Sequence, residues 1–232
     1  MTLQLQDIDA AVDFPALLRC LLAAYESPPQ PLTEVIVPMR GLAPAAAQLS
    51  LDEGASRLAR WHASDPTSHW QKVVDVETGR IAGGATWHIY DADPFAEPDT
   101  TEAVWYPDDG SRRFAEQALE SMARPRSQVA RKPHLYLFNI FTHPDYRRRG
   151  VGQKIMDWGM RKADELGLEI FLRRHTARPA AVPSKRLHRA GRDGNGASDG
   201  FPGRGVDEDG GKGTTVYVLS YVAASRREVR RG

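Results

Sequence analysis

The chain of 232 residues contains a single cysteine, Cys20, so it has no internal disulfide framework and its composition fits a reducing compartment. No hydrophobic run reaches the length of a membrane span, and the first residues, MTLQLQDIDAAVDF, lack the basic-then-apolar order of a secretory signal. We therefore expect a cytoplasmic protein, with a nuclear location left open, and no contact with a membrane. Cys20 lies in the apolar helical stretch FPALLRCLLAAY, which predicts a buried structural thiol.

An excess of charge of one sign is also missing, because the formal net charge is only +1. This total is divided unevenly along the chain. Residues 173–232 hold 13 Lys and Arg against 6 Asp and Glu, whereas residues 1–172 hold 18 against 24. Half of the 20 glycines also lie in residues 173–232. The break predicts a domain of residues 1–172 followed by a tail of residues 173–232.

The domain of residues 1–172 has alternating helical and strand patterns. DFPALLRCLLAAYES has apolar residues at helical spacing, and SLDEGASRLARWHASDP predicts a second helix that begins at a capping-box-like Ser50 and Glu53. WQKVVDVETGRIAGGATWHIY alternates on both sides of ETGR, which predicts a hairpin of strands near Gln71–Val76 and Ile81–Tyr90. GSRRFAEQALESMAR predicts a helix within the polar, proline-containing segment 91–132.

The most regular patterns lie between residues 134 and 172. HLYLFNIFTHP is a compact apolar run that predicts a buried strand. RGVGQKIMDWGMRKADELG predicts an amphipathic helix that ends at Gly167, and LEIFL predicts another short strand.

The stretch HPDYRRRGVGQKI, residues 143–155, places three arginines directly before Gly-x-Gly at the start of this helix. Glycine lets the backbone turn tightly, and the first N–H groups of a helix have no partner within it. They lie at the positive end of the helix dipole, which favours a phosphate. A Walker loop and a Rossmann fingerprint need glycines that are missing. A nucleic-acid patch and an unliganded charged helix start are the weaker alternatives.

With these residues the chain resembles the GNAT-type N-acetyltransferase superfamily. The cofactor motif of that family, [RQ]-x-x-G-x-[GA] between a central strand and a helix, here reads Arg147-Arg148-Arg149-Gly150-Val151-Gly152. The preceding THPDY and the following QKIMDWGMRKADELGLEIFL also fit. The resemblance covers roughly residues 3–172 and is most specific over 135–172.

The resemblance implies acetyl-CoA as the co-substrate. In that family, backbone amides of the motif bind the pyrophosphate, and by position these belong here to Arg148 through Gln153. The central strand of the family pairs its main chain with the pantetheine arm. The implied cofactor-binding residues are Ile140, Phe141, Thr142, Arg147, Arg148, Arg149, Gly150, Val151, Gly152 and Gln153.

Acyl transfer to an amine needs a base for the amine proton and a proton donor for the departing thiolate. Members of the family often use a carboxylate on or near the central strand as the base, but this strand offers only Tyr136 and Asn139. His88 and Asp91, at the end of the preceding strand, are conceivable bases, and each is also explained as ordinary polarity at a strand end. We therefore assign no catalytic residue.

Two further histidines, His134 and His143, flank the central strand and are expected to face solvent. No metal site is predicted.

The tail departs from the family, which continues with a helix carrying L-Y-x-x-x-G-F, whose tyrosine often protonates the thiolate. Here the chain has no sustained period and few large apolar residues, which predicts disorder, and TTVYVLSYV is its only strand-like run. A one-base shift of the commonest codons for Ala181–Leu187 permits L-Y-x-x-[NS]-G-F. We therefore interpret the tail as an out-of-frame translation, with a genuine divergent tail as the alternative.

These observations predict an α+β acetyltransferase with a mixed, mostly antiparallel sheet flanked by helices, its C-terminal strands and helix missing. The implied reaction moves an acetyl group from acetyl-CoA to a primary amine of a small molecule or peptide. Attack would be direct, since no nucleophile for a covalent intermediate is evident. The alternatives are a non-catalytic acyl-CoA-binding protein without the acid-bearing half, and a nucleic-acid binder that uses the basic tail.

Overall fold

Helices and strands alternate along the part of the chain that the computed structural model describes, which is residues 2–26, 31–41, 43–97, 102–175, 185–187 and 216–221. The helices are α1 (Phe14–Glu26), α2 (Pro31–Ile36), α3 (Pro44–Ser64), α4 (Gly110–Val129) and α5 (Val151–Leu166), with a 3₁₀ turn η1 (Pro144–Tyr146). The strands are β1 (Leu3–Asp7), β2 (Ser68–Asp75), β3 (Ile81–Tyr90), β4 (His134–Thr142), β5 (Glu169–His175), β6 (Lys185–Leu187) and β7 (Val216–Tyr221).

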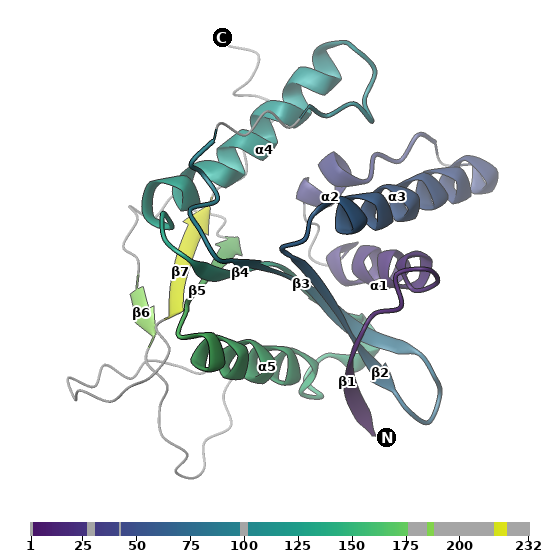
Figure 1. Cartoon of the computed structure of the whole chain (residues 1–232). Helices are drawn as coiled ribbons and strands as arrows, with labels where there is room; N and C mark the ends of the chain where they lie inside the picture. The colour runs from purple at the N-terminus through teal and green to yellow at the C-terminus, as the bar shows by residue number, and fades with distance from the viewer. Residues whose placement is uncertain are drawn as a thin grey trace.

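All these strands form one sheet in the order β1-β2-β3-β4-β5-β7-β6. Strands β1 to β4 pair antiparallel with their neighbours, as do β6 and β7, whereas β5 is parallel to both β4 and β7. Helix α5 covers one face of the sheet, and α1, α2 and α3 cover the other (Figure 1). This confirms the predicted α+β class and its mixed, mostly antiparallel sheet.

Two apolar cores occupy the opposite faces of the sheet. The core under α5 contains, among others, Trp87, Leu135, Ile155 and Ile170. The core under α1 contains, among others, Phe14, Leu17, Trp70 and Phe141. Helix α5 approaches β3 closely because Gly159 has no side chain: a Cβ there would lie 2.3 Å from Cη2 of Trp87.

The start of α3 differs from the prediction. The helix begins at Pro44, and Ser50 lies inside it, where its hydroxyl donates to the carbonyl of Ala46 at 2.9 Å. The predicted capping box of Ser50 and Glu53 is therefore wrong. Proline is well suited to the first helical position, and the alanines that follow it have the highest helix propensity, so the helix starts earlier than its apolar pattern does.

The sheet continues past residue 172. Strand β5 runs on to His175, and β7 pairs with it from Ile170–Val216 to His175–Tyr221. Residues Val216–Tyr221 of the strand-like run TTVYVLSYV thus form a strand. Most of the tail, with the greater part of the segment Ala181–Leu187, lies outside the described residues, so the boundary at residue 172 stays a prediction.

Candidate active site at the open edge of strand β4

Strands β4 and β5 run side by side for only part of their length. Their pairing ends at Leu137 and Leu172. Beyond this point β5 follows β7, while β4 follows β3 as far as Thr142. Among the described residues, Phe138–Thr142 therefore have a strand neighbour on one side only. We call this segment the open edge of β4, because no described strand pairs with its outward N–H and C=O groups.

The open edge begins at a β-bulge. The register against β3 shifts by one residue here, so that Phe138 has no partner in that strand. Successive side chains of a strand alternate between faces, and a regular strand would put Asn139 on the α5 face with Leu137. The bulge turns Asn139 to the α1 face instead, where the hydroxyl of Tyr25 contacts it.

Helix α5 starts beside this edge. Its N-cap, Gly150, has φ +81°, a conformation that favours glycine, and no side chain caps the helix. Helix α4 differs, because its N-cap Asp109 accepts a hydrogen bond from the amide of Ser111 at 2.7 Å. A Cβ on Gly152 would meet only Cδ1 of Ile140, at 4.0 Å. The first turn of α5 thus presents backbone amides that no side chain caps, and the described residues leave room for a side chain at Gly152.

The three arginines before α5 have different positions. Arg148 has φ +61°, so two residues within this short loop take the left-handed conformation. The guanidinium of Arg147 donates to the carbonyl of Ala24 at 2.9 Å, in the last turn of α1. The guanidinium carbon of Arg149 lies 5.7 Å from the ring centroid of Tyr146. Arg147 therefore ties the loop to α1, a contact that the sequence did not indicate.

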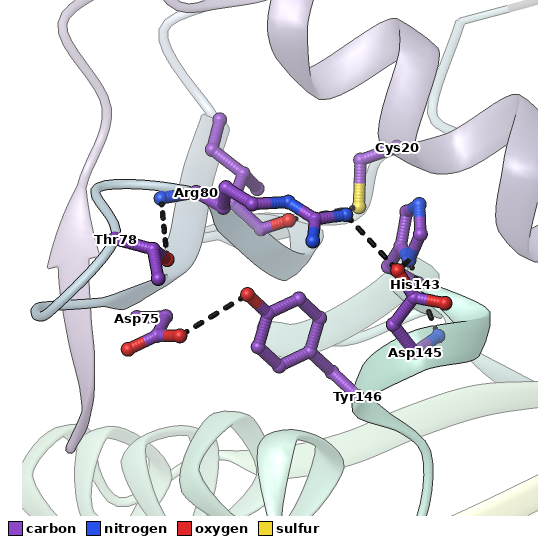
Figure 2. A network of polar contacts seen from close by, with 8 residues as sticks. Cys20, Asp75, Thr78, Arg80, His143, Asp145 and Tyr146 are labelled. Atoms are coloured by element: carbon purple, nitrogen blue, oxygen red, sulfur yellow. Dashed lines mark hydrogen bonds and ion pairs between the residues drawn. The ribbon is translucent and has the colours of Figure 1, made fainter. Parts of the chain in front are cut away.

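The loop is also anchored to the β2–β3 hairpin, as Figure 2 shows. The buried hydroxyl of Tyr146 donates to Asp75 Oδ2 at 3.1 Å. Arg80 forms an ion pair with Asp145 at 3.0 Å, and its guanidinium carbon lies 5.5 Å from the centroid of the Tyr146 ring. These contacts hold η1 in place, so the amides of α5 are positioned before any ligand arrives.

His88 is held by a carboxylate. Its Nδ1 lies 3.1 Å from Oδ2 of Asp65, and since a carboxylate only accepts, Nδ1 carries the proton. Oδ1 of Asp65 accepts from both the amide (2.9 Å) and the hydroxyl (2.7 Å) of Thr67. The hydrogen bond with His88 is the main reason that the pKa of Asp65 lies below its usual range. Asp65 was not singled out from the sequence, because no local pattern connects it to His88.

The other nitrogen of His88, Nε2, has no hydrogen-bond partner within the described part of the chain. The ring packs edge-on against Phe138, the bulge residue, at 5.9 Å between centroids, and its side chain is 17% exposed. A proton-accepting nitrogen thus lies next to the start of the open edge. The alternative candidate, Asp91, is exposed in a bend beyond the end of β3.

Tyr25 reaches the open edge from α1. Its hydroxyl donates to the carbonyl of Ile140 at 3.0 Å and contacts Oδ1 of Asn139. Directly opposite Asn139 in β3, Thr86 is buried, and its hydroxyl has no hydrogen-bond partner among the described residues. Sequence reasoning missed both Tyr25 and Thr86, because they look like an ordinary helix end and an ordinary strand residue.

Two histidines expected to face solvent do not. His134 is fully buried, and its Nδ1 donates to the carbonyl of Lys132 at 2.6 Å. Burial lowers the pKa of His134, because the charged ring would lose its hydration. His143 is partly buried, and its ring accepts a hydrogen bond from the amide of Asp145 at 3.2 Å. Both rings serve the fold.

Cys20 is a buried structural thiol, as predicted. Its Sγ lies 3.6 Å from the carbonyl of Ile81, and burial raises its pKa to about 12. The described residues contain no cluster of three or more histidine, cysteine or carboxylate side chains suited to a metal ion. In the same residues, no helix combines the length and apolar character needed to cross a bilayer.

A comparison with protein-family models identifies the family of this chain. The family model for the acetyltransferase (GNAT) family matches residues 39–191. The chain therefore belongs to the GNAT acetyltransferase family. The match includes β4, η1 and α5, and so the open edge and the helix start beside it, whereas Tyr25 and Ala24 of α1 lie outside the matched range. No curated protein matches the chain.

Solved structures of acetyltransferases are similar to this chain at low sequence identity. One, from Corynebacterium glutamicum ATCC 13032, is described as histone acetyltransferase HPA2 and related acetyltransferase (21% identity, 70% of this chain and 72% of that chain, TM-score 0.41). Others are glucosamine-6-phosphate N-acetyltransferase from Arabidopsis thaliana (9%, 74% and 82%, 0.41) and the aminoglycoside 6'-N-acetyltransferase AAC(6')-Ih from Acinetobacter baumannii (13%, 74% and 78%, 0.38). Similarity at this level carries no information about the substrate.

Proposed function

We propose that this chain transfers an acetyl group from acetyl-CoA to a primary amine of a small molecule or peptide. The observation that carries the proposal is the open edge of β4 beside an uncapped helix N-terminus. A diphosphate suits the amides of Arg148–Gln153, which gain the dipole of α5 and have space in front of Gly152. An extended amide-bearing arm suits the main chain of Ile140–Thr142, which can pair with it as a strand would.

His88 is the base in this proposal. A primary amine gives up one N–H proton as its nitrogen attacks the thioester, and Nε2 of His88, which has no hydrogen-bond partner among the described residues, can accept it next to the bulge. Asp65 holds Nδ1 and stabilises the positive charge that forms on the ring. The amine nitrogen then forms its bond to the carbonyl carbon as the C–S bond breaks, so no covalent bond to the protein is needed.

Calorimetric titration with CoA is the first test. We expect one site per chain, with CoA as the competitor of acetyl-CoA, and release of free thiol when acetyl-CoA meets the right member of a panel of primary amines. Absence of CoA binding by a folded chain would refute the proposal. Binding without turnover for any amine would instead favour a non-catalytic acyl-CoA-binding protein, which is the second candidate because L-Y-x-x-x-G-F is missing from the sequence.

A basic-tailed nucleic-acid binder is tested in the same preparation. Residues 173–232 carry its charge, and most of them lie outside the described residues. Attraction to phosphates alone weakens steeply with salt. Under the proposed function, RNA or DNA added at moderate salt leaves the CoA isotherm unchanged.

Replacement of His88 by glutamine should lower kcat/KM for the amine by about 100-fold or more, the usual contribution of a general base. The acidic limb of the pH–rate profile is the rise in rate as the base loses its proton with increasing pH, and this limb should disappear in the variant. CoA affinity should stay within about twofold of the wild-type value, because the aromatic contacts of the His88 ring are with Tyr90, Tyr136 and Phe138 and not with the start of α5. A His88→Gln enzyme with an unchanged profile would exclude His88 as the base.

Asp65→Asn tests the positioning role separately. The amide keeps the size of the carboxylate but removes its charge, so the protonated ring of His88 loses its negative partner. We expect the acidic limb to move to lower pH, with a smaller fall in kcat than in His88→Gln. A purely structural role for Asp65 would lower the melting temperature and leave the limb in place.

A further inference from the structure

We propose that the hydroxyl of Tyr25 protonates the thiolate that departs during acyl transfer. The inference rests on the proposed function and assigns it a catalytic residue from α1. In the family the tyrosine of L-Y-x-x-x-G-F often does this, and the described residues include no helix after α5 that could carry one. Among the described residues, Tyr25 of α1 offers a phenol hydroxyl at the open edge of β4.

The hydroxyl of Tyr25 lies close to the position expected for the thioester sulfur of acetyl-CoA. With the diphosphate at the start of α5, an arm that follows the open edge runs from Thr142 back to Ile140, and its far end reaches Asn139 and the bulge. The hydroxyl of Tyr25 lies at this point, 3.0 Å from the carbonyl of Ile140 and in contact with Oδ1 of Asn139. An arm amide that donates to the carbonyl of Ile140 releases the hydroxyl toward the sulfur.

Two further observations show that the α1 side of the open edge contains polar groups at its start. The hydroxyl of Thr86 is buried across from Asn139 without a hydrogen-bond partner among the described residues, which is uncommon because an unsatisfied buried hydroxyl is destabilising. The bulge at Phe138 is what brings Asn139 to the same face. The polar side chains of Tyr25, Thr86 and Asn139 thus lie on the α1 side of the sheet near the start of the open edge.

The end of α1 is held firmly enough for such a role. Ala24 is buried, and its carbonyl accepts the hydrogen bond from Arg147 at 2.9 Å. A cation at a helix C-terminus is stabilising, because it satisfies the last carbonyls and opposes the dipole. The neighbouring Tyr25 is therefore fixed relative to the loop that precedes α5.

The step is balanced with His88. The amine nitrogen forms a bond to the carbonyl carbon and gives its proton to Nε2 of His88. The C–S bond breaks, its electron pair stays on sulfur, and sulfur takes the proton of the Tyr25 hydroxyl. The phenolate regains a proton from solvent, and the imidazolium releases one, so the net products are the amide and the thiol.

The test compares Tyr25→Phe with the wild-type chain in two measurements. First, CoA itself is bound, and ionisation of its thiol is followed by the ultraviolet absorption of the thiolate. A donated hydrogen bond favours the charged form, so we expect the bound thiol of the wild type to ionise about one pH unit lower than that of Tyr25→Phe. Second, kcat should fall about 100-fold in the variant, with the KM for acetyl-CoA within about threefold.

Tyr106→Phe is the matched control, because its hydroxyl bonds the carbonyl of Glu34 at 2.8 Å, away from β4. It should change neither measurement. Asn139→Ala, which keeps the phenol and removes one acceptor of its hydrogen bond, should lower the ionisation pH of the bound thiol by a smaller step, because the hydroxyl is released toward the sulfur, and it serves if Tyr25→Phe does not fold. Equal thiol ionisation in wild type and both variants overturns the role of Tyr25. Failure of the wild type to bind CoA overturns the proposed function instead.

Discussion

Gly152→Asp should leave the fold intact and remove CoA binding. The added side chain has room, since its Cβ would meet only Cδ1 of Ile140 at 4.0 Å. A carboxylate in the first turn of a helix is stabilising by about 0.3–1 kcal/mol, so the melting temperature should be unchanged or higher. The same carboxylate occupies the amides of α5 and repels the diphosphate. We expect CoA to bind about 100-fold more weakly or worse, since each hydrogen bond to a charged group contributes about 1.5–3 kcal/mol.

The control for this prediction is Gly110→Asp, at the first position of α4. A Cβ there meets no heavy atom within 4 Å, and the residue lies after a helix N-cap that is already satisfied by Asp109. The two variants carry the same change at the start of different helices. Calorimetry with CoA distinguishes them, and wild-type affinity in Gly152→Asp would show that the start of α5 does not bind the diphosphate.

Gly83→Ala should have the largest effect on stability. Gly83 lies in β3 opposite Thr142, and a Cβ there would be 2.4 Å from the carbonyl oxygen of Phe141 and 2.7 Å from Cγ1 of Val151. One of these atoms belongs to the backbone, so the sheet or α5 must move. Overpacking of this kind costs about 1–3 kcal/mol, and we expect the upper end because a main-chain atom is involved.

Urea unfolding measures this change, with Gly110→Ala as the control in open space. Because Val151 is the first residue of α5, the same substitution should also weaken CoA binding several-fold. Equal unfolding free energies for the two variants would contradict the close approach of β3 to β4 and α5.

The turn before α5 and the start of that helix could be predicted because their signal is local. The strand, the turn and the helix start are contiguous in HPDYRRRGVGQKI, and Gly150 and Gly167 mark the beginning and end of α5 in the positions expected. A local signal was wrong for α3. The capping pattern at Ser50 predicted the start of this helix, but the alanine-rich sequence before Ser50 is already helical.

The polar groups on the α1 face could not be predicted, because they come together only in the folded chain. Tyr25 and Asn139 are 114 residues apart in sequence. The bulge at Phe138 leaves no mark in HLYLFNIFT, a mostly apolar run without the regular alternation that an extra residue would disturb. The ion pair of Asp65 and His88 likewise joins the end of α3 to the last part of β3. Neither segment contains a sequence pattern that predicts this contact.

The hydrogen bond from Arg147 to Ala24 can connect the binding of one part of a substrate to the reaction at another part. It connects the loop that would hold the diphosphate to the helix end that carries Tyr25. Contacts with the non-reacting part of a substrate can thereby restrain a group at the reacting part. A short acyl thioester without the nucleotide would lack those contacts. It should then react slowly even when saturating, because the phenol would be less well oriented toward its sulfur.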